Sequence, residues 1–330
     1  MYIVTRTLPA FICALLGLAS FSSLADNHWN VQQRLPMGAQ IQTNHNQQYQ
    51  PLKHAQKPWK ICALIPHLKD TYWIGIDYGL VQHSKQLGIN LDLFEAGSYY
   101  NENKQLDQLD YCMKQPYDAI ILGAVSPEIL NHYQAKTHKP IIGLVNRIES
   151  KQVVNQVGVN WYQMGYFAGQ YVSQHAQNPS TLALLTGPKS VGGSDWVEQG
   201  MRAALEHSEV KITDIRHQDN NRALYREQLT LLLDKQHPNY IVGSAVAIEA
   251  AVSATKDIRH PKISLISTYL SPSILRGMQR GRIAHSNDDQ VVLQGKLAVD
   301  VAVKQLQTNQ VYGDIGPKIL EWSMPAKSQN

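Results

Sequence analysis

Short apolar runs alternate with helical periodicity along most of the chain. The first run, at residues 60–65, leads into a polar turn, after which Trp73, Ile76, Leu80 and Leu87 recur at helical spacing. A strand that passes through a loop into a helix is the first half of a parallel βαβ unit. Strands are further predicted at residues 90–94, 119–123, 140–145 and 153–157, and helices at residues 72–86, 101–114 and 127–137.

A second series of the same units follows the first. Its strands are predicted at residues 181–185, 211–216, 240–243, 262–266 and 283–286, and its helices at residues 162–175, 194–207, 222–234, 247–255, 272–279 and 288–307, before a last extended piece at 318–322. Regular alternation of strands and helices is typical of parallel sheets that carry helices on both faces. The sequence therefore predicts an α/β fold with two doubly wound parallel-sheet lobes.

The first 57 residues do not share this rhythm. Residues 1–25 have the form of a secretory signal: Arg6 provides the positive start, residues 8–18 are apolar, and Ser23-Leu24-Ala25 is a cleavage site after Ala25. The apolar stretch is too short to span a membrane, and no later run approaches that length. We therefore expect a protein exported to the periplasm, with residues 26–57 as a Gln- and Asn-rich N-terminal extension.

Charge and cysteine content narrow the function. The formal charge of +4 falls to 4 − 1 = +3 when the segment that contains Arg6 is removed, and Lys and Arg residues are not clustered. This distribution argues against nucleic acid as a partner. Cys62 and Cys112 remain in the exported chain, where either a disulfide bond or two buried thiols would be consistent with the sequence.

Motif searches do not indicate an enzyme. The glycine-rich stretch at residues 187–194 resembles a phosphate loop, but Gly193 stands where the lysine is needed. The histidines lack the spacing of zinc ligands, and Asp288-Asp289 is best interpreted as the N-terminal cap of the following helix. We expect no catalytic residues, no metal and no cofactor.

Aromatic residues instead gather where strands of both halves end. Ligands of open α/β sheets bind at the carboxyl ends of the strands. Each residue alone is better explained by packing, but their common position indicates a site. Several aromatic rings with one acid suit a methylated cation better than a sugar. The candidate ligand residues are Asp70, Tyr72, Trp73, Tyr99, Trp161, Trp196 and Tyr269.

These features resemble the type I periplasmic binding proteins, the ribose-binding-like family. The resemblance runs from residue 59 to the C-terminus and rests on the paired aromatics, on residues 157–160 followed by Gly165, and on residues 196–200. It implies two lobes joined by three hinge strands, with residues 58–159 and 287–310 in the N-terminal lobe and residues 160–286 and 311–330 in the C-terminal lobe. Asn146-Arg147 replaces the Asp-Arg of sugar-binding members, which argues against a sugar ligand.

Two segments, PHLKDTYWIGIDYG and AGSYYN, resemble periplasmic sensors of trimethylamine N-oxide (TMAO) more closely. That resemblance implies a receptor that binds TMAO in an aromatic cage between the lobes, with Asp70 balancing the charge. It also implies signalling to the periplasmic domain of a membrane sensor histidine kinase, which induces TMAO respiration. The alternatives are a solute-binding protein of an ABC transporter, for a sugar or a methylated amine, and an enzyme on a doubly wound fold.

Overall fold

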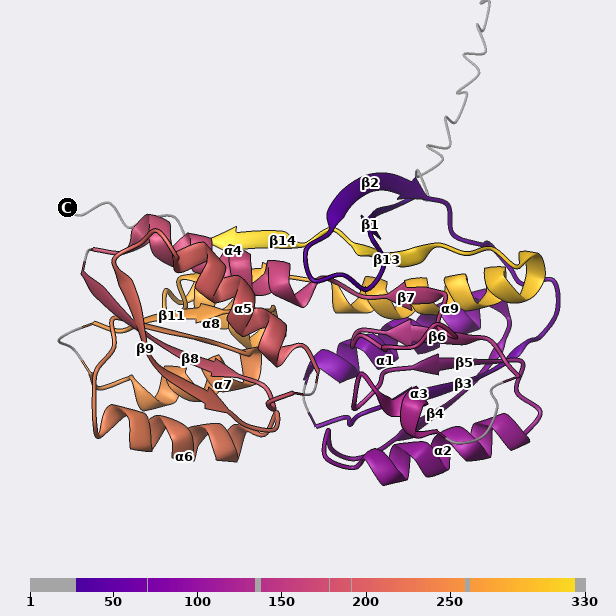
Figure 1. Cartoon of the computed structure of the whole chain (residues 1–330), viewed down its shortest axis with the longest axis horizontal. Coiled ribbons are helices and arrows are strands. Elements are labelled where there is room, and N and C mark those ends of the chain that lie inside the picture. The colour runs from indigo at the N-terminus through magenta and orange to yellow at the C-terminus, as the bar shows by residue number, and fades with distance from the viewer. Residues whose placement is uncertain are drawn as a thin grey trace, which may run out of the picture.

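The chain folds into two α/β lobes that lie side by side, as the sequence predicts (Figure 1). The computed structural model describes residues 28–69, 71–133, 138–177, 179–190, 192–258 and 262–323. The expected signal segment, residues 1–25, and the candidate Asp70 lie outside the described residues. Within the described ranges, no helix combines the length and the apolar character that a membrane span requires.

The first lobe is built on an eight-stranded sheet with the order β2-β1-β13-β7-β6-β5-β3-β4. The strands from β13 to β4 are parallel, whereas β1 runs antiparallel to both β2 and β13. The strands are β1 (Trp29–Leu35), β2 (Thr43–Tyr49), β3 (Lys60–Ile65), β4 (Asn90–Glu95), β5 (Ala119–Leu122), β6 (Ile141–Leu144), β7 (Asn155–Val157) and β13 (Gly313–Pro317).

Helices cover both faces of this sheet. Successive side chains of a strand point to opposite faces, so each core strand packs against helices on both sides. Ile61 and Ala63 of β3 pack in the cluster under α1 (Thr71–Leu87) and α9 (Val291–Thr308). Cys62 and Leu64 pack under α2 (Glu102–Lys114) and the short α3 (Ile129–His132). The core strands are therefore buried on both sides, which explains their unbroken apolar runs in the sequence.

The second lobe has a six-stranded sheet with the order β14-β12-β11-β10-β8-β9. Helices α4 and α5 cover one face, and α6, α7 and α8 cover the other. The strands are β8 (Ser180–Thr186), β9 (Val210–His217), β10 (Tyr240–Gly243), β11 (Ser264–Ser267), β12 (His285–Asp288) and β14 (Leu320–Ser323), and the helices are α4 (Trp161–His175), α5 (Ser194–Leu205), α6 (Arg222–Leu233), α7 (Ala245–Ala254) and α8 (Pro272–Gln279).

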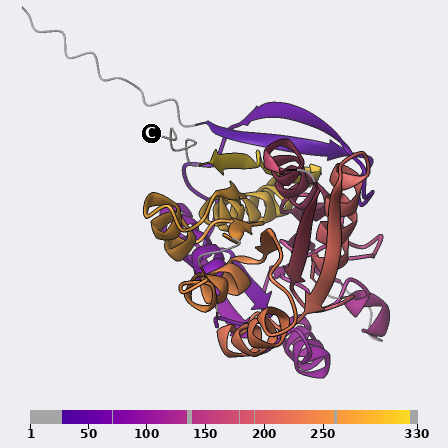
Figure 2. The same cartoon turned by 90° about the vertical axis from the view of Figure 1, so that its left-hand side faces the viewer.

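The N-terminal segment differs from the expected extension. Residues 29–49 form the β1–β2 hairpin, which adds two strands to the first sheet (Figures 1 and 2). Strand β13 also pairs in the first sheet, although we expected residues 311–330 to belong to the C-terminal lobe. The chain therefore crosses between the sheets after β7, after β12 and between β13 and β14. The first crossing lies near Asn160, and the third lies between Pro317 of β13 and Leu320 of β14.

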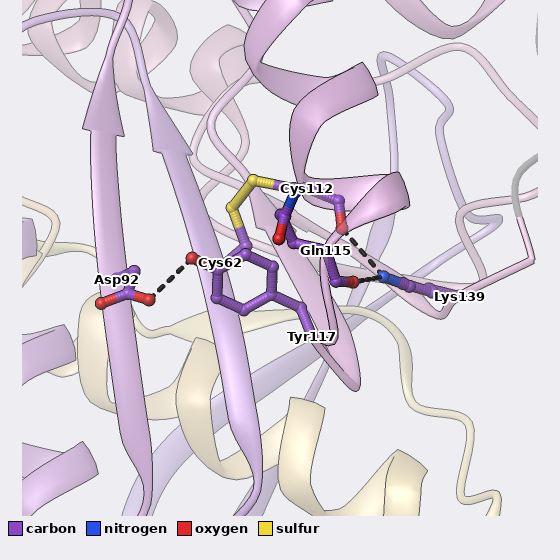
Figure 3. The surroundings of a disulfide bond; sticks show 6 residues. All are labelled: Cys62, Asp92, Cys112, Gln115, Tyr117 and Lys139. Atoms are coloured by element: carbon purple, nitrogen blue, oxygen red, sulfur yellow. Dashed lines mark hydrogen bonds between the residues drawn. A yellow bond between two sulfur atoms is a disulfide. The ribbon is translucent and has the colours of Figure 1, made fainter.

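A disulfide bond joins Cys62 of β3 to Cys112 of α2 (Figure 3). Their Cα atoms are 6.2 Å apart, within the range that a disulfide can bridge. Lys139 closes the end of the same helix by donating to the carbonyl oxygens of Cys112 and Gln115. The sequence left the state of the two cysteines open, and the structure assigns the bonded form.

Candidate ligand site between the lobes

A small cavity of about 50 Å³ lies between the two lobes. Tyr99 and Asn146 line it from the first lobe, and Trp161 lines it from the first crossing. The second lobe contributes the loop after β8, the start of α5, and residues that follow β9, β10 and β11. These second-lobe residues are Thr186, Gly187, Pro188, Gly192, Gly193, Ser194, Val197, Asn220, Ser244, Thr268 and Tyr269. The cavity thus lies at the carboxyl ends of both sheets, where ligands of this architecture bind.

Three aromatic side chains from three parts of the fold meet beside the cavity. Tyr72 stands at the start of α1, Trp161 at the start of α4, and Tyr269 in the loop after β11. The ring centroids of Tyr72 and Tyr269 are 5.0 Å apart, those of Tyr72 and Trp161 are 6.0 Å apart, and those of Trp161 and Tyr269 are 6.3 Å apart. We call these three residues the ring cluster. The sequence predicted each of them as a candidate, and the fold brings them together.

Trp73 and Tyr99 form a second layer next to the ring cluster. Trp73 is completely buried, and its indole Nε1 donates to the hydroxyl of Tyr99 at 3.1 Å. Asn146 Nδ2 donates to the same hydroxyl at 3.3 Å. Trp73 does not line the cavity, and its ring packs edge-on against Tyr72, with the ring centroids 6.0 Å apart. Its ring also fills the space beside Gly123, where an added Cβ would lie 2.6 Å from a ring carbon.

The glycine-rich loop after β8 has a packing role. The indole of Trp161 lies on the backbone of Gly193, and a Cβ at this position would lie 2.2 Å from the ring. This contact explains why glycine stands where a phosphate loop would carry its lysine. The loop therefore holds an aromatic ring in place rather than binding phosphate.

Asp289 is a buried acid beside the ring cluster that the sequence interpretation missed. It lies at the second crossing, is fully buried, and accepts from the Tyr72 hydroxyl at 2.6 Å and from Gln294 Nε2 at 2.8 Å. Burial raises its pKa from 3.8 to about 6, with hydrogen bonds to Tyr72 and Gln294 opposing the rise. Among the described residues its Oδ1 atom has no hydrogen-bond partner.

The helix-cap interpretation of Asp288-Asp289 is therefore wrong for Asp289. Helix α9 begins at Val291 after Gln290, which adopts a left-handed conformation, and none of the described side chains caps it. Asp288 instead accepts from the backbone N–H of Gln290 at 2.8 Å. Two adjacent acids before an apolar helix do not reveal in sequence which of them turns inward.

A strained turn sets the direction of the side chains after β6. Val145 has a φ of 65°, and the N–H of Asn146 donates to the carbonyl oxygen of Leu144 at 2.8 Å. This is the rare γ-turn with positive φ, which is unfavourable for a β-branched residue. The turn directs Asn146 into the cavity, and the Val145 carbonyl accepts from the indole of Trp161 at 3.4 Å.

Trp196 lies apart from the ring cluster. It lines a flanking cavity of about 250 Å³ on the other side of Trp161, together with Arg147 and the loop of the β1–β2 hairpin. The Arg147 guanidinium lies 5.0 Å from the centroid of the Trp196 ring. The arginine that follows Asn146 is thus stacked on Trp196.

The arrangement favours binding over catalysis or metal coordination. Ring faces attract cations, and a buried carboxylate supplies the opposite charge. The rings of the cluster contact one another, so a ligand must lie against their cavity side or separate them. Across the described residues, no three His, Cys, Asp or Glu side chains are grouped as metal ligands.

Comparison with known proteins places the chain among binding proteins. The family model of periplasmic binding proteins and the sugar binding domain of the LacI family matches residues 58–325. The periplasmic protein TorT of Escherichia coli, from strains O157:H7 and K12, is 37% identical over 320 residues, which are 96% of this chain and 90% of TorT.

Solved structures agree with this placement. An ABC transporter solute-binding protein from Bradyrhizobium sp. BTAi1 with bound bis-tris has a TM-score of 0.76 and 32% identity, covering 90% of this chain and 91% of its own. The complex of the TorS sensor domain with TorT has a TM-score of 0.74 without ligand and 0.71 with TMAO, at 35% identity in both. These two matches cover 82% and 80% of this chain, and 95% and 92% of the other. This chain therefore belongs to the family of periplasmic binding proteins and the sugar binding domain of LacI, in which its relatives include TorT.

Proposed function

We propose that this protein is a periplasmic receptor that binds TMAO between its lobes and signals to the periplasmic domain of the sensor histidine kinase TorS. Its relatives supply the biological context, because TorT has been solved in complex with the TorS sensor domain in the presence of TMAO. The observation that carries the proposal in this chain is the ring cluster beside a buried carboxylate. The protein acts as a receptor and not as an enzyme.

The chemistry of TMAO matches this arrangement. Its three methyl groups carry positive charge, which the faces of Tyr72, Trp161 and Tyr269 attract. Asp289 supplies negative charge beside Tyr72. Asp70, which the sequence predicts to balance the charge of the ligand, directly precedes α1 and remains part of the proposed site.

The N-oxide oxygen accepts hydrogen bonds and so needs donors. Hydroxyl groups that line the cavity, such as those of Tyr99 and Ser244, are the candidates.

Calorimetry tests the proposal directly. TMAO should bind the purified protein, and the isolated TorS periplasmic domain should change the affinity for TMAO. Thermodynamic linkage then requires TMAO to change the affinity for TorS by the same factor. Absence of TMAO binding refutes the ligand. If the complex with the TorS domain forms but the affinity for TMAO is the same with and without that domain, then TMAO binding is not coupled to TorS, and the proposed signalling is refuted.

One observation favours a second function. The solute-binding protein of an ABC transporter from Bradyrhizobium is 32% identical and covers 90% of this chain. Under this alternative the receptor delivers a sugar or a methylated amine to a permease. Binding to TorS together with no stimulation of transport in reconstituted vesicles would favour the sensor.

A further inference from the structure

The β1–β2 hairpin is fixed firmly to the first lobe. Tyr49 donates to Oδ1 of Asp300 in α9 at 2.7 Å, and His83 of α1 lies 2.7 Å from the other oxygen of this buried carboxylate. At the other end of the hairpin, Arg34 is buried and donates to the carbonyl oxygen of Gly158 at 2.8 Å. The hairpin therefore moves with the first sheet.

Its loop is also held in one conformation. Asp314 of β13 accepts through Oδ2 from the N–H of Gly38 at 2.7 Å and from Gln42 Nε2 at 2.6 Å. Asn160, at the first crossing, donates to the carbonyl oxygen of Gln40 at 2.9 Å and to Gln42 at 3.0 Å. A loop bound at these positions is expected to move together with the first lobe and the first crossing.

From this anchored position the hairpin reaches the second lobe. Gln40 Nε2 donates to Gln199 Oε1 of α5, and Asn44 Nδ2 donates to Gln163 Oε1 of α4 at 3.3 Å. Both bonds join uncharged amides, the first exposed and the second partly buried. Bonds of this kind are weak and reversible, so they can form and break as the lobes move.

The two helices that receive these contacts form one unit. Helices α4 and α5 approach so closely that a Cβ at Gly200 would lie 1.9 Å from the carbonyl oxygen of Tyr162. The start of α5 also lines the cavity through Ser194 and Val197. A contact at Gln199 therefore acts on the same helix that forms one wall of the ligand site.

A second contact between the lobes joins the loop after β4 to the loop after β9. Ser98, after β4, donates to Oδ2 of Asp219, after β9, at 2.8 Å. The present arrangement is thus closed at two places, through Ser98 and Asp219 and through the hairpin. Gln199 of α5 lines the flanking cavity, and Gln40 of the hairpin donates to it. Moving α5 away from Arg147 would therefore widen this cavity and separate Gln199 from Gln40.

We infer that the β1–β2 hairpin is an interlobe strap, in which Gln40 and Asn44 hold the second lobe closed through Gln199 and Gln163. This inference rests on the proposed function, because it assigns the hairpin a role in setting the affinity of the same site. A strap that bonds only to the closed form raises the closed population before ligand arrives. The apparent affinity rises with that population.

Spin labels test the strap without any ligand. Lys104→Cys on α2 and Glu227→Cys on α6 place labels on exposed residues of the two lobes, and the native Cys62 and Cys112 are bonded to each other. The pair Gln40→Ala and Gln199→Ala should shift the distance distribution to longer distances. Gln48→Ala is the matched control, because it removes a similar amide bond, to Asn30, inside the hairpin. An unchanged distribution in the double variant overturns the strap.

TMAO titrations provide the second measurement. The double variant should bind TMAO about threefold to tenfold more weakly, the effect of losing one neutral hydrogen bond. Equal affinity in the double variant and Gln48→Ala also overturns the strap. If the unmodified protein does not bind TMAO, the proposed ligand fails, but the label distances still decide whether the strap exists.

Discussion

The hydroxyl of Tyr72 donates a 2.6 Å hydrogen bond to Oδ2 of Asp289. This bond ties the start of α1 to the second crossing between the lobes. It also aligns one ring of the cluster with a carboxyl group that is fully buried. Burial and the neighbouring carboxylate raise the pKa of Tyr72 well above its usual value, so the phenol stays protonated and keeps donating.

Asp289 should make the protein less stable as the pH rises from about 4 to about 6. Burial raises its pKa to about 6 in the folded protein, against 3.8 for an ordinary aspartate. Between these values the folded chain retains a proton that the unfolded chain releases, and stability falls by about 3 kcal/mol. Asp289→Asn removes this titration, so the variant should gain stability relative to the parent as the pH rises. Urea unfolding at pH 4.5 and pH 7 measures the difference.

His285 provides a check on this pH prediction. Its burial lowers its pKa to about 4, so its effect on stability has the opposite sign, with stability lost as the pH falls below about 6.5. Both proteins contain His285, and its contribution therefore cancels in the comparison. A stability difference between parent and Asp289→Asn that stays constant with pH would contradict the assignment of the titration to Asp289.

Trp161 and Trp73 should respond differently to replacement by leucine. Trp161→Leu removes a ring face from the cluster and should weaken TMAO binding by about 1–2 kcal/mol, with a smaller effect on folding. Trp73→Leu should lower the free energy of unfolding by about 2–4 kcal/mol, because Trp73 is completely buried. Calorimetry and urea unfolding on both variants separate the two roles. Equal losses of stability would argue against this division between site and core.

The sequence predicted the parts of the fold that follow a strong hydrophobic pattern. Strand β3 and helix α8 have the predicted bounds, because one is an unbroken apolar run and the other starts at a proline after the Ser271 cap. The hairpin was missed because β2, with the sequence TNHNQQY, shows no apolar pattern. It is an edge strand in which Tyr49 is the single buried residue. Strand β13 contains two glycines and a proline around Ile315, which gives no periodicity.

The candidate site was predictable in part, because three of its aromatic residues occupy positions in the sequence that indicate a ligand site. Tyr72, Trp161 and Tyr269 follow strands or begin helices at the carboxyl ends of the sheets, where position alone indicates a ligand site. Trp196 also lies near the carboxyl end of a strand. Helix α5, however, places its side chain against Arg147 in the flanking cavity and away from the ring cluster. Asp289 could not be found, because only the tertiary structure turns it toward Tyr72.

The disulfide should stabilise the fold mainly by restricting the unfolded chain. Cys62 and Cys112 are 50 residues apart, and closing a loop of this size contributes about 2–4 kcal/mol. The double variant Cys62→Ala and Cys112→Ala should lose stability by that amount and keep its ligand affinity, since the bond lies on the α2 face of the sheet. Urea unfolding measures the loss. Two free thiols in the denatured, unreduced parent protein would contradict the bonded form.

If the site recognises the charge of its ligand as well as its shape, it should bind TMAO more tightly than a neutral molecule of the same shape. tert-Butyl alcohol has the same three methyl groups and a terminal oxygen, but its central carbon carries no positive charge. If the ring cluster and Asp289 act electrostatically, TMAO should bind at least tenfold more tightly than the alcohol. The five heavy atoms of TMAO allow about −7.5 kcal/mol at most, at about 1.5 kcal/mol per atom, so its dissociation constant should be no tighter than a few μM. Competition calorimetry tests both statements, and equal binding of the two compounds would show that the site reads methyl groups alone.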